Sequence, residues 1–314
     1  MTPDDARWAE LAALSETYTC YSAAVAAWTA LGGGDWRAAV DTGLELALLD
    51  EGDGLFGFVH FPAGLRARLG LARRSAAEPG AAVGAILAEL ERSGRAIVAG
   101  DGFFLPWHVA HGKRHVPHWF VLTGSAAGPV VADPFSARNN LGLQEAVLLP
   151  VEPSSLRDLA RWGLADDEVV LLREAFALGD DTRPVPREPF QWFVHEPVED
   201  VSPVAGGARG PDAIRRLARH FRERGGRADA YRQADDIWSV ARHRAFLARR
   251  AAETGAGEWA REHLDPLAKR WSHMAPLLMQ AVLAVGAGRE PTGSVATTLD
   301  ELAGREEAAA AAGP

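Results

Sequence analysis

The chain has 314 residues, of which 47% are hydrophobic and 24% are charged, a composition that excludes a disordered or fibrous protein and allows a full core. Its 33 basic and 42 acidic residues give a net charge of −9, which argues against nucleic acid because phosphate binding needs a broad cationic surface. No apolar run approaches the ~20 residues of a membrane span, and the acidic N-terminus is unlike a secretory signal. We therefore expect a cytoplasmic protein whose partners are small molecules or proteins, with neither nucleic acid nor a membrane involved.

The first hundred residues predict helices followed by a strand. Apolar residues recur at helical spacing within 15–31, and three glycines then end that helix. Further helices are expected over 36–49 and 79–93. The β-branched run at 95–100 predicts a short buried strand. From there on, apolar residues recur about every 2 residues, as in strands, and no longer about every 3.6 residues, as in helices.

A β-hairpin is the next predicted element. Strands are expected over 119–123 and 130–132, with a turn centred between Ser125 and Ala127. Antiparallel pairing about that centre joins residues whose numbers sum to about 251 to 253, so His118 faces Asp133 or one of the next two positions. Side chains opposed in this way stand ~4.5–5.5 Å apart at Cβ, close enough for the carboxylate to accept the imidazole N–H.

The remainder of the chain predicts one more strand and then helices. A strand is expected within 141–150. The density of proline and charged residues makes 180–211 the best candidate linker. Apolar residues at helical spacing predict helices over 211–285. The Ala-rich end at 306–314 is expected to fray because it has nothing to bury. The expected organisation is α+β, with a catalytic domain at 1–150, a connecting segment at 151–210 and a helical domain at 211–314.

Cys20 is the only cysteine, so no disulfide can form within the chain. It is expected at the opening of a helix, where free backbone N–H groups and the helix dipole favour the thiolate, which is the nucleophilic form. A buried, inert cysteine is the alternative. The expected pair of His118 and Asp133 favours the reactive interpretation, because a cysteine beside a base that is held by an acid is an activated nucleophile.

Three motifs carry a resemblance to a known family. The segment Gly94–His108, which ends in Leu-Pro-Trp-His, is followed by Gly112–His118 and by the Val-Val-Ala-Asp-Pro segment Val130–Pro134. Together they resemble the N-terminal domain of the butirosin biosynthesis protein H family, which is related to papain-like cysteine peptidases and especially to bacteriocin-processing peptidases. The helical region around Arg244–Leu247 and Trp271 is similar to the region that accompanies this domain.

The resemblance implies a papain-like fold with Cys20, His118 and Asp133 as the catalytic triad. It implies acyl or aminoacyl transfer from an acyl carrier protein or pantetheine thioester to a small amine or hydroxyl acceptor, through an acyl-enzyme on Cys20. The expected chemistry needs no cofactor. A thioesterase, cyclase or amidase with the same triad is the alternative enzyme, and a non-catalytic binding protein for a carrier-bound intermediate is the alternative of another class.

One position departs from the peptidase pattern. Peptidases of this class carry a glutamine about six residues before the cysteine, and this chain has Leu14 there. The Cys20 backbone N–H is one expected hydrogen-bond donor to the oxyanion. The candidates for the second donor are Thr17, Thr19 and a backbone amide of the loop 51–57. The missing glutamine lowers the expectation of peptidase activity.

Further residues are candidates for the substrate pocket. Trp107, His108 and His115 lie in the irregular segment between two strands, Asp101 ends the first of those strands, and Gly54 lies in a tight glycine loop. Asp101 is expected to contact His118 or substrate, or else to serve as a turn residue. The glycine loop matches G-x-G-x-x-G, but a strand-like run follows it where dinucleotide binding needs a helix.

A zinc site is a weaker possibility in the same segment. Four histidines at spacings of three, four and three residues would share one face of a helix, but Pro106, Gly112 and Pro117 interrupt that helix. We therefore predict no metal.

The basic segment from Arg209 to Arg250 holds twelve arginines and five acidic residues. Arg215, Arg219 and Arg222 share one helical face and are candidates for docking an acidic carrier protein, with a solvated surface as the alternative.

Overall fold

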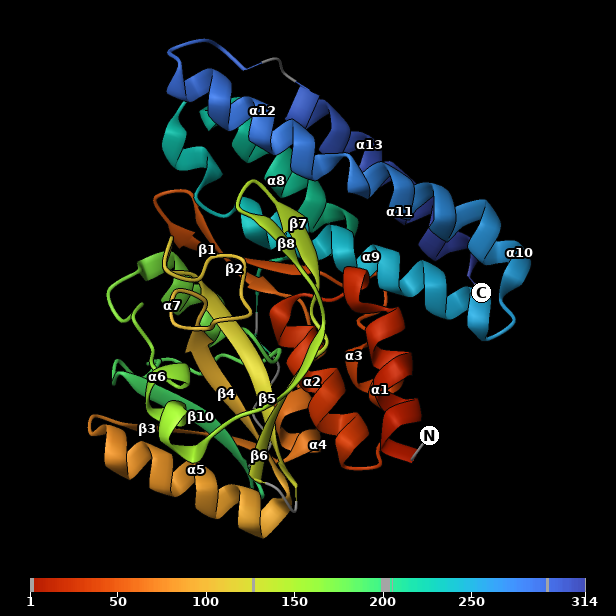
Figure 1. The fold of residues 1–314 in the computed structure, drawn as a ribbon. Coiled ribbons are helices and arrows are strands. Elements are labelled where there is room, and N and C mark those ends of the chain that lie inside the picture. Colours follow the sequence, from red (N-terminus) through yellow and green to blue (C-terminus); the bar gives the residue numbers. More distant parts are fainter. Residues whose placement is uncertain (1–2, 126–127, 199–203, 205, 292–293, 314) are drawn as a thin grey trace. The chain divides into compact units, whose positions relative to one another are not determined.

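The computed structural model describes residues 3–125, 128–198, 204, 206–291 and 294–313. N-terminal helices and antiparallel sheets precede a C-terminal helical region, which confirms the α+β class (Figure 1). Two compact units divide the chain. The first draws on 1–40, 63–175 and 180–202, and the second on 41–62, 176–179 and 203–314. None of the described helices combines the length and apolar character that crossing a bilayer requires.

The first unit is built on a six-stranded sheet in which every neighbouring pair is antiparallel. In spatial order the strands are β3 (Leu71–Ala76), β10 (Phe190–His195), β4 (Arg95–Asp101), β5 (Pro117–Ser125), β6 (Gly128–Asp133) and β9 (Val147–Pro150). A separate two-stranded hairpin consists of β7 (Ala137–Asn139) and β8 (Gly142–Gln144).

Helices cover both faces of this sheet (Figure 1). The helix predicted over 79–93 is confirmed as α5 (Pro79–Ser93), and it buries Ile86 and Leu90 against a cluster that includes Phe120. Consecutive residues of a strand face opposite sides, so Trp119 faces the other way, where its ring lies 4.7 Å from that of Tyr21. Tyr21 belongs to α2 (Cys20–Leu31). The other helices of this unit are α1 (Pro3–Ala13), η1 (Ser15–Thr17), α3 (Trp36–Val40), α4 (Leu65–Leu69), η2 (Pro153–Ser155), α6 (Leu156–Leu159) and α7 (Glu168–Ala175).

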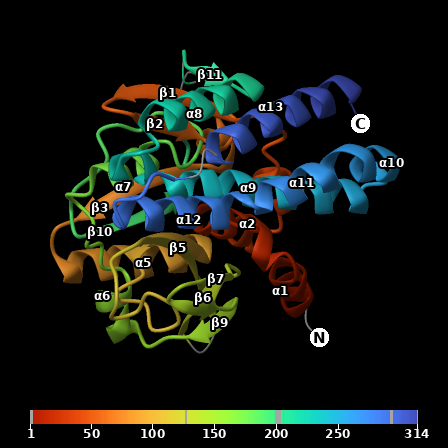
Figure 2. The same cartoon turned by 90° about the horizontal axis from the view of Figure 1, so that it is seen from above.

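The second unit combines a three-stranded sheet with the C-terminal helices. Its strands are β11 (Ala208–Arg209), β1 (Ala47–Gly52) and β2 (Leu55–Val59), in that order. The helices are α8 (Pro211–Arg224), η3 (Ala228–Tyr231), α9 (Ala234–Glu253), α10 (Gly257–Trp259), the π-helical η4 (Ala260–Leu264), α11 (Asp265–Ser272), α12 (Met274–Gly286) and α13 (Ser294–Ala312). Helix α8 lies along α13 and α9 along α11 (Figure 2), and one apolar core joins Leu48 and Phe58 of the sheet to these helices.

Two predicted segments were wrong. The helix expected over 36–49 ends at Val40, and β1 follows, because pairing with β2 and burial in the helical core override local helical spacing. The expected linker 180–211 contains β10, which lies inside the sheet between β3 and β4. Residues 41–62 therefore belong with the C-terminal helices, and much of the expected connecting segment belongs with the first unit.

The expected fraying of 306–314 was also wrong, since α13 continues to Ala312. Glu306 is fully buried, and its carboxylate accepts hydrogen bonds from Arg244 (Nε to Oε1, 2.7 Å) and from Trp271 (Nε1 to Oε1, 2.8 Å). Ala309 is buried as well. The C-terminal segment thus provides Glu306, the acidic partner of a buried ion pair with Arg244, which its alanine-rich composition does not predict.

Candidate functional site

Cys20 is the first residue of α2, as expected. Thr19 caps the helix: the Ser22 N–H donates to Thr19 Oγ1 (3.1 Å), and the Thr19 N–H donates to Ser22 Oγ (2.8 Å). This capping box fixes the start of the helix. Cys20 is partly exposed and lies at the positive end of the helix dipole, where a nearby negative charge is stabilised.

The β5–β6 register places His118 near Asp133. The strands pair Val121 with Ala132 and Thr123 with Val130, so partner numbers sum to 253, within the predicted range. Asp133 is therefore a diagonal neighbour of His118 on the same face and not its direct partner, and long side chains in diagonal positions can still reach each other. The imidazole Nε2 lies 2.7 Å from Asp133 Oδ2. Part of the predicted turn centre, at 126–127, lies outside the described residues.

The thiol of Cys20 meets the start of β5. Its Sγ lies 3.9 Å from the carbonyl oxygen of Pro117, and Cys20 is close enough to His118 to help raise the pKa of that imidazole. Burial alone would lower the pKa of His118, but the charge of Asp133 and the hydrogen bonds with Asp133 and Cys20 outweigh it and raise that pKa to about 10. The imidazolium is thus favoured at neutral pH, and it can pair with a thiolate.

Asp133 is fully buried and held by several donors. Its Oδ2 accepts from Trp107 Nε1 (2.9 Å) and Gln144 Nε2 (3.4 Å), and its Oδ1 accepts from the Phe135 N–H (3.1 Å). Trp107 was an expected pocket residue, and it lies against the carboxylate. Gln144 was missed in the sequence, where no motif marks it.

His108 packs against His118, with ring centroids 4.5 Å apart. The Ala110 N–H donates to His108 Nδ1 (3.0 Å), so the ring proton is on Nε2. Burial and the nearby His118 lower the pKa of His108 to about 2, which keeps this ring neutral beside a charged one. A Cβ on Gly102 would lie 2.5 Å from His108 Nδ1, so only glycine fits there.

Asp101 and His115 form a second pair. His115 Nδ1 lies 2.6 Å from Asp101 Oδ2, and the N–H groups of Phe103 and Val116 donate to Asp101 Oδ1. Gly100 pairs with His118 across β4 and β5, so the next residue, Asp101, points to the opposite face. Asp101 therefore holds together the two ends of the loop that begins at Gly102. This is the turn role that the sequence analysis gave as the alternative to a contact with His118 or substrate.

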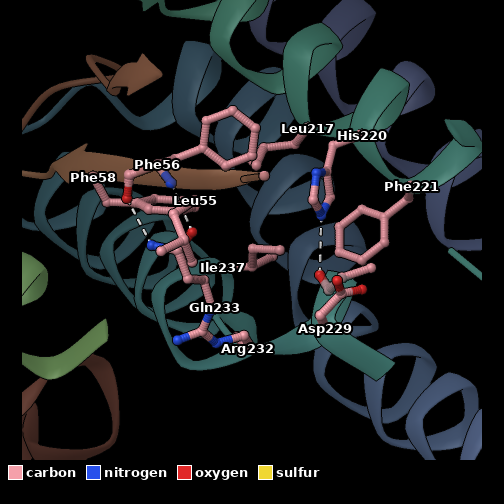
Figure 3. Close-up of a pocket in the computed structure, with 12 residues that line it drawn as sticks. Leu55, Phe56, Phe58, Leu217, His220, Phe221, Asp229, Arg232, Gln233 and Ile237 are labelled. Atoms are coloured by element: carbon pink, nitrogen blue, oxygen red, sulfur yellow. Dashed lines mark hydrogen bonds between the residues drawn. The ribbon is translucent and has the colours of Figure 1, made fainter. Parts of the chain in front are cut away.

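The glycine loop forms part of the second unit. Gly54 is in the turn between β1 and β2 at φ 77°, and a Cβ there would lie 2.7 Å from the Arg224 guanidinium. It lines a small pocket with Phe56, His220 and Gln233 (Figure 3), whose interior has about the volume that one water molecule needs. The G-x-G-x-x-G pattern is thus a β-hairpin turn, without the strand–turn–helix context of a dinucleotide site.

The expected docking arginines are partly neutralised by acidic side chains. Arg215 pairs with Asp212 and Glu307, and Arg222 pairs with Asp300. Two of these three acids, Asp300 and Glu307, lie on α13, outside the basic segment from Arg209 to Arg250. Arg219 is exposed. The structure therefore weakens the charge argument for a docking surface on α8.

Both threonines expected as second oxyanion donors are engaged elsewhere. Thr17 Oγ1 donates to the Leu14 carbonyl oxygen (2.7 Å), and Thr19 Oγ1 is used in the capping box. The loop 51–57 belongs to the second unit. Within the described residues, no three or more His, Cys, Asp or Glu side chains converge as a metal-binding group.

No protein-family model matches the chain, and no similar curated protein is found. The functional interpretation therefore depends on the geometry of the site. That geometry consists of a cysteine on a helix N-terminus, an imidazole in contact with its sulfur, and a buried carboxylate behind the imidazole.

Proposed function

We propose that the protein is a papain-like cysteine acyltransferase that transfers an acyl or aminoacyl group from a pantetheine thioester, free or on a carrier protein, to an amine or hydroxyl acceptor. The observation that carries this proposal is the placement of Cys20 at a helix N-terminus, beside an imidazole, His118, that is hydrogen-bonded to the buried Asp133. The resemblance to the butirosin biosynthesis protein H family supports the choice of donor. A cytoplasmic location would keep the cysteine reduced.

In the first step, the Cys20 thiolate attacks the thioester carbonyl carbon and forms a new carbon–sulfur bond. The bond to the pantetheine sulfur then breaks, and the His118 imidazolium gives its proton to the leaving thiolate. The products are a Cys20 acyl-enzyme, neutral His118 and free pantetheine thiol.

In the second step, the acceptor amine or hydroxyl attacks the acyl-enzyme carbonyl carbon. Neutral His118 takes the acceptor's proton while the carbon–sulfur bond to Cys20 breaks. This restores the thiolate and the imidazolium and releases an amide or ester. Asp133 accepts the Nε2–H throughout, which leaves Nδ1 directed at the reacting atoms.

The environment of Cys20 supports a thioester donor over a peptide donor. Leu14 is buried where related peptidases place an amide side chain toward the oxyanion, and the neighbouring threonines are already engaged. A thiolate is a far better leaving group than an amine, since a free thiol has a pKa of ~8.5. Thioester cleavage therefore needs less oxyanion stabilisation than peptide cleavage does.

Release of free thiol from a panel of acyl-pantetheine thioesters tests the proposal. Wild-type protein is expected to release thiol in the presence of amines and to form the amide, whereas Cys20→Ala is expected to release none and His118→Ala to release it far more slowly. Release with formation of the free acid would indicate a thioesterase, and a cyclic product would indicate a cyclase. Absence of release with every donor would contradict acyl transfer from a thioester and favour the binding protein or the amidase.

Alkylation provides an independent check on the thiol. Iodoacetamide is expected to modify native Cys20 rapidly at neutral pH and to modify the His118→Ala variant slowly. Labelling of wild-type protein that occurs only after denaturation would instead indicate an inert cysteine.

A further inference from the structure

Two surface segments are attached to the Asp133 carboxylate. The loop 102–116 provides Trp107, and the hairpin of β7 and β8 provides Gln144; both side chains donate to Asp133 Oδ2. Lys113 joins the two segments, because its Nζ donates to the carbonyl oxygens of Val109 (3.3 Å) and Leu141 (3.2 Å). The triad's carboxylate therefore fixes the positions of both segments.

These segments carry cations and no acidic residue. Lys113, Arg114 and Arg138 are all exposed, and among the described residues no carboxylate forms an ion pair with any of them. Of the adjoining acids, Asp101 and Asp133 are buried and engaged, which leaves Glu145 as the exposed one. In a chain of net charge −9, these two segments therefore carry three cations and no negative charge.

We propose that Lys113, Arg114 and Arg138 bind the phosphate of the donor's phosphopantetheine arm while the acyl group reaches Cys20. This inference rests on the proposed function, because it names the group by which the thioester donor is recognised. Guanidinium groups match phosphate oxygens in bidentate geometry, and an ammonium held by two carbonyls adds a fixed positive charge.

A phosphate fits this surface better than an acidic protein face does. The cations come from two short segments, and the exposed large apolar side chain on the β7–β8 hairpin is Leu143, at 52% exposure. Stable protein interfaces bury ~800 Å² on each partner around an apolar centre, which three cations and one leucine do not provide. A single doubly charged group is the ligand of matching size.

Rates of Cys20 acylation by two matched donors test the inference. One donor is an S-acyl pantetheine with a neutral arm, and the other is the same thioester of 4′-phosphopantetheine. Wild-type protein is expected to prefer the phosphorylated donor by roughly tenfold or more at low salt, with the preference falling as salt rises. In the double variant Arg114→Gln/Arg138→Gln the preference is expected to approach one.

The matched control is Arg68→Gln/Arg157→Gln, which removes two exposed arginines elsewhere in the first unit and is expected to keep the preference. Equal rates for the two donors in wild type, or a preference that survives in Arg114→Gln/Arg138→Gln, would overturn the inference. A preference seen only with a carrier-bound donor would overturn it in favour of an acidic protein partner.

Binding of phosphopantetheine to the Cys20→Ala variant separates this inference from the proposed function. Calorimetry is expected to show salt-sensitive binding that Arg114→Gln/Arg138→Gln weakens by about tenfold, even if no acylation is ever observed. Absence of binding together with normal acylation would overturn the phosphate site alone and leave the acyltransferase proposal standing.

Discussion

His118 and Asp133 lie diagonally across the β5–β6 pair, with 2.7 Å between the imidazole Nε2 and the carboxylate Oδ2. This bond fixes which imidazole nitrogen faces Cys20, because Nε2 is occupied. The carboxylate is itself held by Trp107, Gln144 and the Phe135 amide. The orientation of the base therefore depends on a network that can be changed one donor at a time.

Substitution of Asp133 by asparagine tests that orientation. Asp133→Asn is expected to lower the rate of thiol release by about 10³–10⁴, because the amide neither balances the imidazolium charge nor holds the neutral imidazole in the tautomer with its proton on Nε2. Trp107→Phe removes one donor to the carboxylate and keeps its charge, so about a tenfold loss is expected. Stopped-flow thiol release on both folded variants measures the two effects, and equal losses in the two would argue against an orienting role for the carboxylate.

The raised pKa of His118 predicts how stability depends on pH. The pKa is about 10 in the folded protein and ~6.5 in the unfolded chain, so the stabilisation of the imidazolium is complete below pH ~6.5 and is lost as the pH rises through 10. The free energy of unfolding of wild type relative to His118→Gln is therefore expected to be larger at pH 6 than at pH 10. Urea denaturation at both pH values gives that difference, and a difference independent of pH would contradict a charged His118.

Gly102 is expected to be intolerant of a methyl group. Gly102→Ala places a Cβ 2.5 Å from His108 Nδ1 and 2.7 Å from Val116, which pushes His108 against His118. A loss of about 1–3 kcal/mol in the free energy of unfolding is expected, together with slower alkylation of Cys20. Gly84→Ala on α5 is the control, since a Cβ there meets nothing within 4 Å and an alanine favours the helix. Similar behaviour of the two variants would refute the close packing of the histidines.

The buried pair in the second unit predicts that the C-terminal tail is structural. Glu306→Gln is expected to lower the free energy of unfolding by about 3–5 kcal/mol, because it leaves Arg244 buried without a counter-charge. The neighbouring Arg305 pairs with Glu301 at the surface, so Arg305→Gln is expected to cost about 0.5 kcal/mol or less. Chemical denaturation measures the free energy of unfolding of both variants. A negligible effect of Glu306→Gln would indicate that the C-terminal segment is frayed.

Local patterns predicted the parts of the site that depend on local structure. Apolar spacing within 15–31 placed Cys20 near a helix start, and the two apolar runs on either side of one turn fixed the strand pairing to within two residues. That range was enough to bring Asp133 beside His118. The contact between Cys20 and His118 joins residues far apart in the sequence, so it came from the family resemblance and not from any pattern of spacing.

Features that depend on nonlocal pairing escaped sequence reasoning. Strand β10 lies among prolines and charges, and its place inside the sheet is set by β3 and β4, which are distant in the sequence. Gln144 and Glu306 are polar residues in unremarkable contexts whose burial depends on their partners. The partial neutralisation of α8 is nonlocal too, because Glu307 and Asp300, which pair with its arginines, lie on α13.

Intact mass after brief mixing with an acyl-pantetheine thioester tests the central claim most directly. The account predicts that wild-type protein gains the mass of one acyl group, that peptide mapping places it on Cys20, and that added amine removes it. Cys20→Ala should gain nothing, and His118→Ala should acylate far more slowly. An unmodified wild-type protein across the whole donor panel, or an acyl group found on another residue, would contradict the account.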